Sequence, residues 1–517
     1  MSFDYIIVGA GSAGCVLARR LTEDPACKVL LLEAGPRDTD RWIHVPLGYG
    51  RLFARTDINW AYQSEPEPAL NGRRVFTPRG KVLGGSSSIN GLVYIRGQRE
   101  DFDGWGIPGW TFDDLLPYFR KSENQSRGAD AWHGVGGPLE VGDLPDRHEL
   151  CDAFIGSAVA LGIPRNDDFN GPIQEGTGYY QATACRGRRC SAATGYLRPA
   201  EKRPNLKVEV DALVTRVRFE GKRAVGVEVN GRIERANREV ILAGGAFNSP
   251  QLLQLSGIGP GALLQQHGIP VVRELPVGEG LQDHFYARTF WRCNKPITLN
   301  DDMASLWRKA GIGLQYLLRK RGPLTVSAGY AAAFVRTRPD SRRPDAQLYF
   351  INFSVEKRGG VLHAHSGFTC SVSQLQVESR GSVRIRSADP SAPPAIRYNY
   401  LATENDRRVM VEGLKLVRRI VNAPPMRDYV RDEYLPGPSV QTDEDWLAFC
   451  RDAGDTVFHP SSTCSMGVVV DERLRVKGIS GLRVIDASVM PSVPSGNINA
   501  AVIAVAEKGA DLVKADA

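Results

Sequence analysis

The chain has 517 residues, of which 42% are hydrophobic and 24% are charged, and this balance excludes disordered, collagen-like and coiled-coil proteins. The 65 Lys and Arg against 58 Asp and Glu give a net charge of +7, and no run of five basic residues occurs, so we expect no nucleic-acid partner. Nine scattered cysteines, and the lack of any stretch near ~20 apolar residues, predict a cytoplasmic protein without a disulfide framework or an integral membrane span.

The first 35 residues predict a strand, a helix and a second strand. Residues 3–8 (FDYIIV) form a β-rich run, and apolar residues recur at helical spacing from Ser12 to Glu23. Residues 28–35 (KVLLLEAG) are mainly apolar, as in a parallel strand that is buried on both faces. The turn between the first strand and the helix contains G-x-G-x-x-G, a pattern that is weak alone but is strengthened by this context.

The glycines of this turn have physical roles in binding a dinucleotide. Gly9 allows a tight turn, Gly11 lets the backbone approach a pyrophosphate at the helix N-terminus, and Gly14 allows close packing of helix and strand. The Glu33 carboxylate can accept from ribose hydroxyls and would repel a 2′-phosphate, which favours FAD or NAD over NADP. The alternative is a glycine-rich turn without a ligand. The predicted contacts are Gly9, Gly11, Ser12, Ala13, Gly14, Glu33 and Ala34.

Later segments predict a return to the same sheet. Residues 206–243 predict a small meander that ends in a buried strand, and residues 482–490 predict another buried strand. An apolar helix follows at 497–513, and residues 379–390 (SRGSVRIRSADP) predict an edge strand that ends in a turn. Because nucleotide-type segments lie at both ends and in the middle, we expect a discontinuous cofactor domain.

A second glycine-rich tract, residues 78–97 (PRGKVLGGSSSINGLVYIRG), has features of a flavin contact. Its glycines allow close approach, its amides and Ser hydroxyls can donate to anionic oxygens, and Asn90 can bond the edge of a ring. By its pattern alone the tract could be any Gly/Ser loop. Its candidate cofactor contacts are Gly84, Gly85, Ser86, Asn90, Gly91, Leu92 and Val93.

This tract and residues 244–259 (GGAFNSPQLLQLSGIG) resemble the two signature stretches of the glucose–methanol–choline (GMC) oxidoreductase family. The similarity runs from residue 3 to about 513 and is loosest over 296–375. Four shorter segments are also similar to family segments, in the family's order: 187–200, 277–284, 458–467 and 484–500. Chance agreement of six segments in order is negligible.

The resemblance implies a mixed α/β fold, α+β overall, with a discontinuous Rossmann-type FAD-binding domain and a substrate domain whose mostly antiparallel sheet is covered by helices. We expect the FAD-binding domain to comprise 1–155, 205–295 and 455–517, and the substrate domain to comprise 156–204 and 296–454. The implied reaction oxidises a primary or secondary alcohol to an aldehyde or ketone by hydride transfer to flavin N5.

The family's catalytic pair corresponds here to His459 and Asn499. A His is a suitable base for the hydroxyl proton, and an Asn can hold the alkoxide without competing for that proton. Either residue could instead be structural, Asn499 as a cap of the last helix. The resemblance adds Val214, Asp486 and Ala487 to the cofactor contacts, with a helix or turn cap as the alternative for Asp486, and Phe458 and Tyr94 are weaker candidates for the substrate pocket.

Some family members attach FAD covalently through a His in the Gly/Ser tract, where this chain has Ile89, so we expect non-covalent FAD. The sequence leaves the alcohol, the oligomeric state and the electron acceptor open, the last being O₂ or a quinone- or dye-type acceptor. The alternative function is that of a non-redox or photochemical relative, such as a hydroxynitrile lyase or a fatty-acid photodecarboxylase.

The other histidines indicate no metal site. His363 and His365 would share one face of a strand, but the sequence offers no third ligand. The remaining five are interpreted as loop or packing residues: His44, His133, His148, His267 and His284.

Overall fold

The computed structural model describes residues 2–356 and 360–517. Its first sheet joins both ends and the middle of the chain in the order β11-β2-β1-β14-β13-β12, with β26 also paired to β14. β1, β2, β11 and β26 run parallel to one another and to the end of β14, whereas β12 and β13 form an antiparallel meander with its beginning. These pairings confirm the predicted parallel unit and the meander. The strands are β1 (Phe3–Val8), β2 (Val29–Leu32), β11 (Leu206–Glu209), β12 (Val214–Glu220), β13 (Arg223–Val229), β14 (Arg232–Leu242) and β26 (Leu482–Val484).

The second sheet is antiparallel throughout, in the order β24-β18-β21-β20-β19-β7, with β25 also paired to β18. One of its faces packs on α6, α12 and α13 in a continuous apolar core. The antiparallel sheet covered by helices is therefore confirmed. The elements are α6 (Glu149–Ala160), β7 (Gly176–Tyr179), β18 (Phe285–Cys293), β19 (Ala331–Val335), β20 (Ala346–Ile351), β21 (Gly367–Gln374), α12 (Glu404–Val421), β24 (Val430–Leu435), α13 (Asp443–Ala453) and β25 (Asp455–Thr456).

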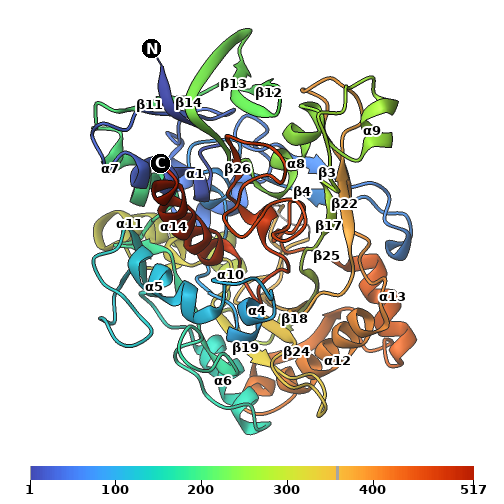
Figure 1. Ribbon diagram of the computed structural model, residues 1–517. Helices are drawn as coiled ribbons and strands as arrows, with labels where there is room; N and C mark the ends of the chain where they lie inside the picture. The colour runs from blue at the N-terminus through green and yellow to red at the C-terminus, as the bar shows by residue number, and fades with distance from the viewer. Residues whose placement is uncertain (1, 357–359) are drawn as a thin grey trace.

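The first and last helices pack side by side against the first sheet. α1 (Ser12–Leu21) contacts α14 (Asn499–Ala515), which also contacts α5 (Phe112–Ser122). Figure 1 shows α14, in dark red, beside the blue α1, while α12 and α13, in orange, lie far from both termini. A Cβ on Gly14 would lie 1.9 Å from the Gly9 carbonyl oxygen, so only glycine allows α1 to approach the turn this closely.

Two sequence expectations about strands differ from the structure. β22 (Gly381–Arg384), predicted as an edge strand, lies between β17 (Glu279–Leu281) and β23 (Ala395–Arg397) in a three-stranded sheet. The local sequence pattern indicates a strand but does not show how many neighbouring strands pair with it, and here two other segments of the chain pair with β22. In addition, β18 belongs to the second sheet, although its residues fall within the 205–295 segment of the expected FAD-binding domain.

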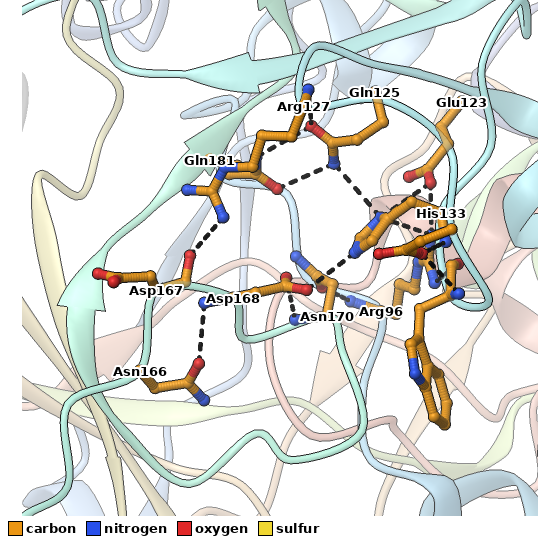
Figure 2. Close-up of polar contacts among 12 residues, drawn as sticks. Arg96, Glu123, Gln125, Arg127, His133, Asn166, Asp167, Asp168, Asn170 and Gln181 are labelled. Carbon is orange, nitrogen blue, oxygen red and sulfur yellow. Dashed lines mark hydrogen bonds and ion pairs between the residues drawn. The ribbon is translucent and has the colours of Figure 1, made fainter.

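A buried polar network borders the apolar core of the first sheet, where Arg96 lies over the Phe119 ring (Figure 2). Arg96 forms an ion pair with Glu123, the two side chains being 1% and 0% exposed. The His133 ring lies between two carboxylates, with Nδ1 3.0 Å from Glu123 and Nε2 2.9 Å from Asp168. This network joins the end of the Gly/Ser tract, at Arg96, to the loop at 166–170. Across the described residues, we find no helix that is both long and apolar enough to span a membrane.

Candidate active site

A cavity of ≈ 1110 Å³ is lined by residues of both sheets and of the loops between them. One end is formed by the turns that follow β1 and β2 and by the Gly/Ser tract. The predicted cofactor contacts that line it are Gly9, Gly11, Ser12, Ala13, Glu33, Ala34, Gly85, Ser86, Asn90, Gly91, Leu92, Val93, Val214, Asp486 and Ala487. Two further predicted contacts, Gly14 and Gly84, are not among the residues that line the cavity and support the turns instead.

The turn before α1 has the features of a dinucleotide cradle. Gly11 is the N-cap and brings no side chain to the helix terminus, so the first N–H groups of α1 are open to a ligand. Gly85 (φ +53°) packs directly on this turn, and a Cβ there would lie 2.7 Å from the Gly11 Cα. Both glycine-rich motifs therefore meet at one point of the cavity wall, where the backbone is bare and a pyrophosphate fits.

Glu33 and Asp486 are the two acidic residues that line the cavity, among the described residues. The Glu33 carboxylate accepts from the Ala10 N–H at 2.8 Å, and burial raises its pKa to about 7. Asp486 accepts from the Gly245 N–H at 2.8 Å and from the Ser488 N–H. It therefore caps a turn, which is the alternative role expected from the sequence, and it also lines the cavity. Both carboxylates thus hold backbone turns in place by hydrogen bonds at the cofactor end of the cavity.

His459 lies where this cavity meets the second sheet. It follows β25, and its backbone N–H donates to Asp283 at 2.6 Å. Asp283 also accepts from the Tyr400 and Thr456 hydroxyls, and burial raises its pKa to about 6. The carboxylate therefore fixes the loop that presents the His459 side chain, which is 7% exposed and lines the cavity.

His284 determines which nitrogen of His459 is free. The Nδ1 atoms of the two rings lie 3.0 Å apart, and His284 Nε2 lies 3.2 Å from the Leu375 carbonyl oxygen. Because a carbonyl only accepts, His284 Nε2 donates, and burial lowers the pKa of this ring to about 4, so it is neutral. His284 Nδ1 then accepts the proton of His459 Nδ1. His459 Nε2 is thereby unprotonated and can accept a hydrogen bond or a proton.

The residue beside His459 Nε2 is Asn497, not the predicted Asn499. Asn497 Nδ2 lies 3.2 Å from Nε2, and Gln347 donates to the Asn497 carbonyl oxygen at 3.3 Å, which fixes the amide orientation. Asn499 is the first residue of α14 and accepts from the Ser12 hydroxyl at 2.7 Å, at the cofactor turn. Helical geometry from 499 onward directs the two asparagines of the N-I-N sequence to different parts of the cavity.

The two weaker pocket candidates have different positions. Phe458 lines the cavity, and its ring lies 5.5 Å from that of Phe53. Tyr94 is not a cavity residue: it is buried in the core of the first sheet, where its hydroxyl accepts from Arg96 at 3.3 Å. The extended backbone near the end of the Gly/Ser tract directs Val93 and Tyr94 to opposite sides, and only Val93 lines the cavity.

Sequence reasoning missed two residues of the site and one of the pocket wall. His284 ends the segment 277–284 that resembles the family, which was a usable signal, but we interpreted it as a packing residue. Asn497 lies in the same segment as Asn499. Arg288, on β18, comes from a stretch with no motif.

The structure also bears on metal binding. The His363 and His365 rings stack at 4.8 Å between centroids. Within residues 2–356 and 360–517, we find no group of three or more His, Cys, Asp or Glu side chains that could hold a metal ion.

Comparison with known proteins identifies the family. Two family models described as GMC oxidoreductase match residues 3–286 and 377–506. An oxygen-dependent choline dehydrogenase of Serratia proteamaculans is 43% identical over 533 residues, covering 99% of this chain and 96% of that protein.

Solved structures of two oxidases have the same fold as this chain over its full length. Pyridoxine 4-oxidase from Mesorbium loti has a TM-score of 0.89 at 32% identity, covering 99% of both chains. Formate oxidase of Aspergillus oryzae, in a study of its FAD modification, has a TM-score of 0.93 at 28% identity, covering 100% of this chain and 98% of that chain. The chain therefore belongs to the GMC oxidoreductase family and is an FAD-dependent oxidoreductase that acts on an alcohol.

Proposed function

We propose that His459 is the base that removes the hydroxyl proton of the alcohol and that Asn497 holds the substrate oxygen. The observation that carries the proposal is the chain of contacts from Leu375 through His284 to His459 Nδ1, which leaves Nε2 unprotonated and adjacent to Asn497. FAD, when bound, supplies the acceptor for the hydride that leaves the CH–OH carbon. The residues named below supply proton transfer and orientation.

In the proposed mechanism the alcohol hydroxyl donates to His459 Nε2. The Asn497 amide, oriented by Gln347, donates to the same oxygen and stabilises the negative charge that develops on it. Burial, and the neighbouring His284 and Arg79, lower the pKa of His459 well below its usual value, so the base is neutral and ready at neutral pH. After proton transfer, His284 Nδ1 continues to accept from His459 Nδ1 and keeps the ring in the same orientation.

Four further parts of the proposal concern the site of FAD, its attachment, the domains and the electron acceptor. The cradle of Gly11 and Gly85 and the open terminus of α1 would hold its pyrophosphate, and Glu33 would lie at its ribose. Ile89 lines the cavity where some relatives have the tethering His, which supports non-covalent binding. We also propose the domain division at 1–155, 205–295 and 455–517 against 156–204 and 296–454, in which β18, at the end of the 205–295 segment, contributes a strand to the second sheet. The proposed electron acceptor is either O₂ or a quinone- or dye-type molecule.

The lyase or photodecarboxylase alternative is not favoured, because the sequence relatives are choline dehydrogenases and the structural neighbours include oxidases. Proton abstraction beside an oriented amide is also what alcohol oxidation requires.

Anaerobic reduction of the bound flavin by a panel of alcohols tests the proposal. Bleaching by one class of alcohol is expected, and its rate should fall at least about 10²-fold in His459→Ala while FAD remains bound. His267→Ala, outside the cavity, is the matched control. A loss of less than about tenfold with FAD bound would remove His459 from this role. Admitting air then distinguishes the acceptors, since rapid recolouring indicates O₂ and slow recolouring indicates another acceptor.

A further inference from the structure

Arg288 is a cation in the wall of the cavity. Alternate residues of β18 point to opposite faces of the second sheet, and Phe285, Ala287 and Trp291 pack into the core beneath it. Tyr286 and Arg288 have the opposite parity and line the cavity. The strand therefore directs the Arg288 side chain into the space above the sheet.

No carboxylate of the described residues forms an ion pair with Arg288 within 4.0 Å, and its guanidinium makes no hydrogen bond to them. It lies instead over the rings of Tyr286 and Phe290, 5.9 Å and 5.6 Å from their centroids. Burial lowers its pKa, an effect that outweighs the attraction of Asp455. An arginine remains charged in a protein, and a half-buried charge without a close counter-ion is costly unless a ligand supplies one.

The other charges of the cavity wall indicate an anionic ligand. The lining residues that the structure describes include five Arg or Lys, namely Arg51, Arg79, Lys81, Arg288 and Lys309. Their acidic counterparts, Glu33 and Asp486, are at the cofactor end and accept from backbone N–H groups. A quaternary ammonium group placed near Arg288 would therefore meet like charge, whereas a carboxylate would meet a matching fork of donors.

The sheet register places Arg288 near the reacting centre. Arg288 pairs with Ser371, and Ser371 pairs with Tyr349. The adjacent row on the same face contains Gln347, which donates to Asn497. One step of two residues along a strand is roughly 7 Å. The Cα atoms of Arg288 and Gln347 are thus separated by two strand spacings and one such step, roughly 12 Å in all, a span that the long Arg288 side chain and a short substrate can bridge together.

We propose that Arg288 binds a carboxylate of the substrate, so that this enzyme oxidises a short alcohol that carries a carboxylate group. The inference rests on the proposed function, because it assumes that the CH–OH group lies at His459 and Asn497. Ser371, opposite Arg288 in the sheet and also lining the cavity, offers a hydroxyl donor to the same carboxylate.

The test uses the FAD-loaded enzyme and three sets of alcohols: hydroxy carboxylates of increasing chain length, the neutral diols of equal length, and choline. We expect anaerobic flavin reduction at low substrate concentration to be about tenfold or more faster with a hydroxy carboxylate than with its diol or with choline. Arg288→Gln should remove this preference and leave diol oxidation within about twofold, and Arg288→Lys should restore part of it. Arg292→Gln is the matched control, since Arg292 is on the same strand but outside the cavity and faces Asp432.

A second readout separates failure of this inference from failure of the proposed function. Carboxylates without a hydroxyl group should perturb the flavin absorbance of the wild type, and the perturbation should be lost in Arg288→Gln. If no alcohol reduces the flavin but carboxylates perturb its absorbance only when Arg288 is present, Arg288 binds carboxylates and the proposed reaction is wrong. If choline reduces the flavin as well as any hydroxy carboxylate, or if Arg288→Gln leaves the preference and the binding unchanged, the inference is overturned.

Discussion

The Nδ1 atoms of His284 and His459 lie 3.0 Å apart in a buried pair that the Leu375 carbonyl oxygen orients from behind. Two histidines that share a hydrogen bond through the same ring atom must adopt complementary tautomers, one donating and one accepting. The Leu375 carbonyl oxygen can only accept, so His284 carries its proton on Nε2 and accepts from His459 through Nδ1. His459 consequently presents a lone pair at Nε2 toward the cavity, and His284 is a positioning residue for the proposed base.

His284→Leu should therefore slow anaerobic flavin reduction by about 10- to 100-fold with FAD still bound, since supporting contacts of this kind typically have that effect. His284→Asn, whose side-chain oxygen can accept from His459 Nδ1, should retain most of the rate. His284 is also one of the groups that lower the pKa of His459, after burial. Because the base must be neutral, the acid limb of the rate–pH profile should move to higher pH in His284→Leu. Equal rates and equal profiles for Leu and wild type would show that the tautomer is fixed in another way.

Asn497 and Asn499 should differ in what their loss removes. Asn497→Ala deletes the amide beside His459 Nε2, so we expect flavin reduction to fall by about 10²-fold with little change in FAD content. Asn499→Ala deletes the acceptor of the Ser12 hydroxyl at the cofactor turn, so we expect weaker FAD retention and a rate, per bound FAD, within about threefold of wild type. Stopped-flow reduction and FAD titration on both variants measure the two effects. The reverse pattern would restore Asn499 as the partner of the base.

The fold was largely predictable because its cofactor end depends on local sequence. Gly9, Gly11 and Gly14 serve interactions within one turn, and their spacing, together with the apolar patterns of the flanking strand and helix, indicates the pyrophosphate site. The antiparallel sheet was predicted only through the resemblance to the family. Strands such as β18 alternate between a helix-covered face and the cavity, as at Phe285 and Tyr286, so their sequences mix apolar and polar residues and do not indicate a buried strand alone.

The catalytic geometry was less predictable for a different physical reason. The contacts of His459 come from residues 175 and 38 positions away, at His284 and Asn497, and nothing in a linear sequence reports which ring nitrogen meets which partner. Arg288 illustrates the same limit, because its role depends on the cavity that its side chain enters and on the lack of an ion pair to it among the described carboxylates.

The pH dependence of stability should reflect the buried His133 (Figure 2). Burial alone would lower its pKa, but hydrogen bonds to Asp168 and Glu123 outweigh burial and raise it to about 9. The folded-state pKa thus exceeds the unfolded value of about 6.5, so the folded protein binds this proton more tightly. The resulting stability is fully present below about pH 6.5 and is lost as the pH rises through about 9.

We therefore expect the free energy of unfolding to fall between pH 6.5 and pH 9 by on the order of 2 kcal/mol more in the wild type than in His133→Gln, which keeps hydrogen-bonding capacity but does not titrate. Thermal midpoints of the FAD-loaded proteins across this range measure the difference, with His267→Gln as the control for a histidine outside this network. A constant gap between wild type and His133→Gln from pH 6 to above pH 9 would mean that the ring is not charged between Glu123 and Asp168. The two carboxylates would then repel across it, and Arg96 alone would have to balance them.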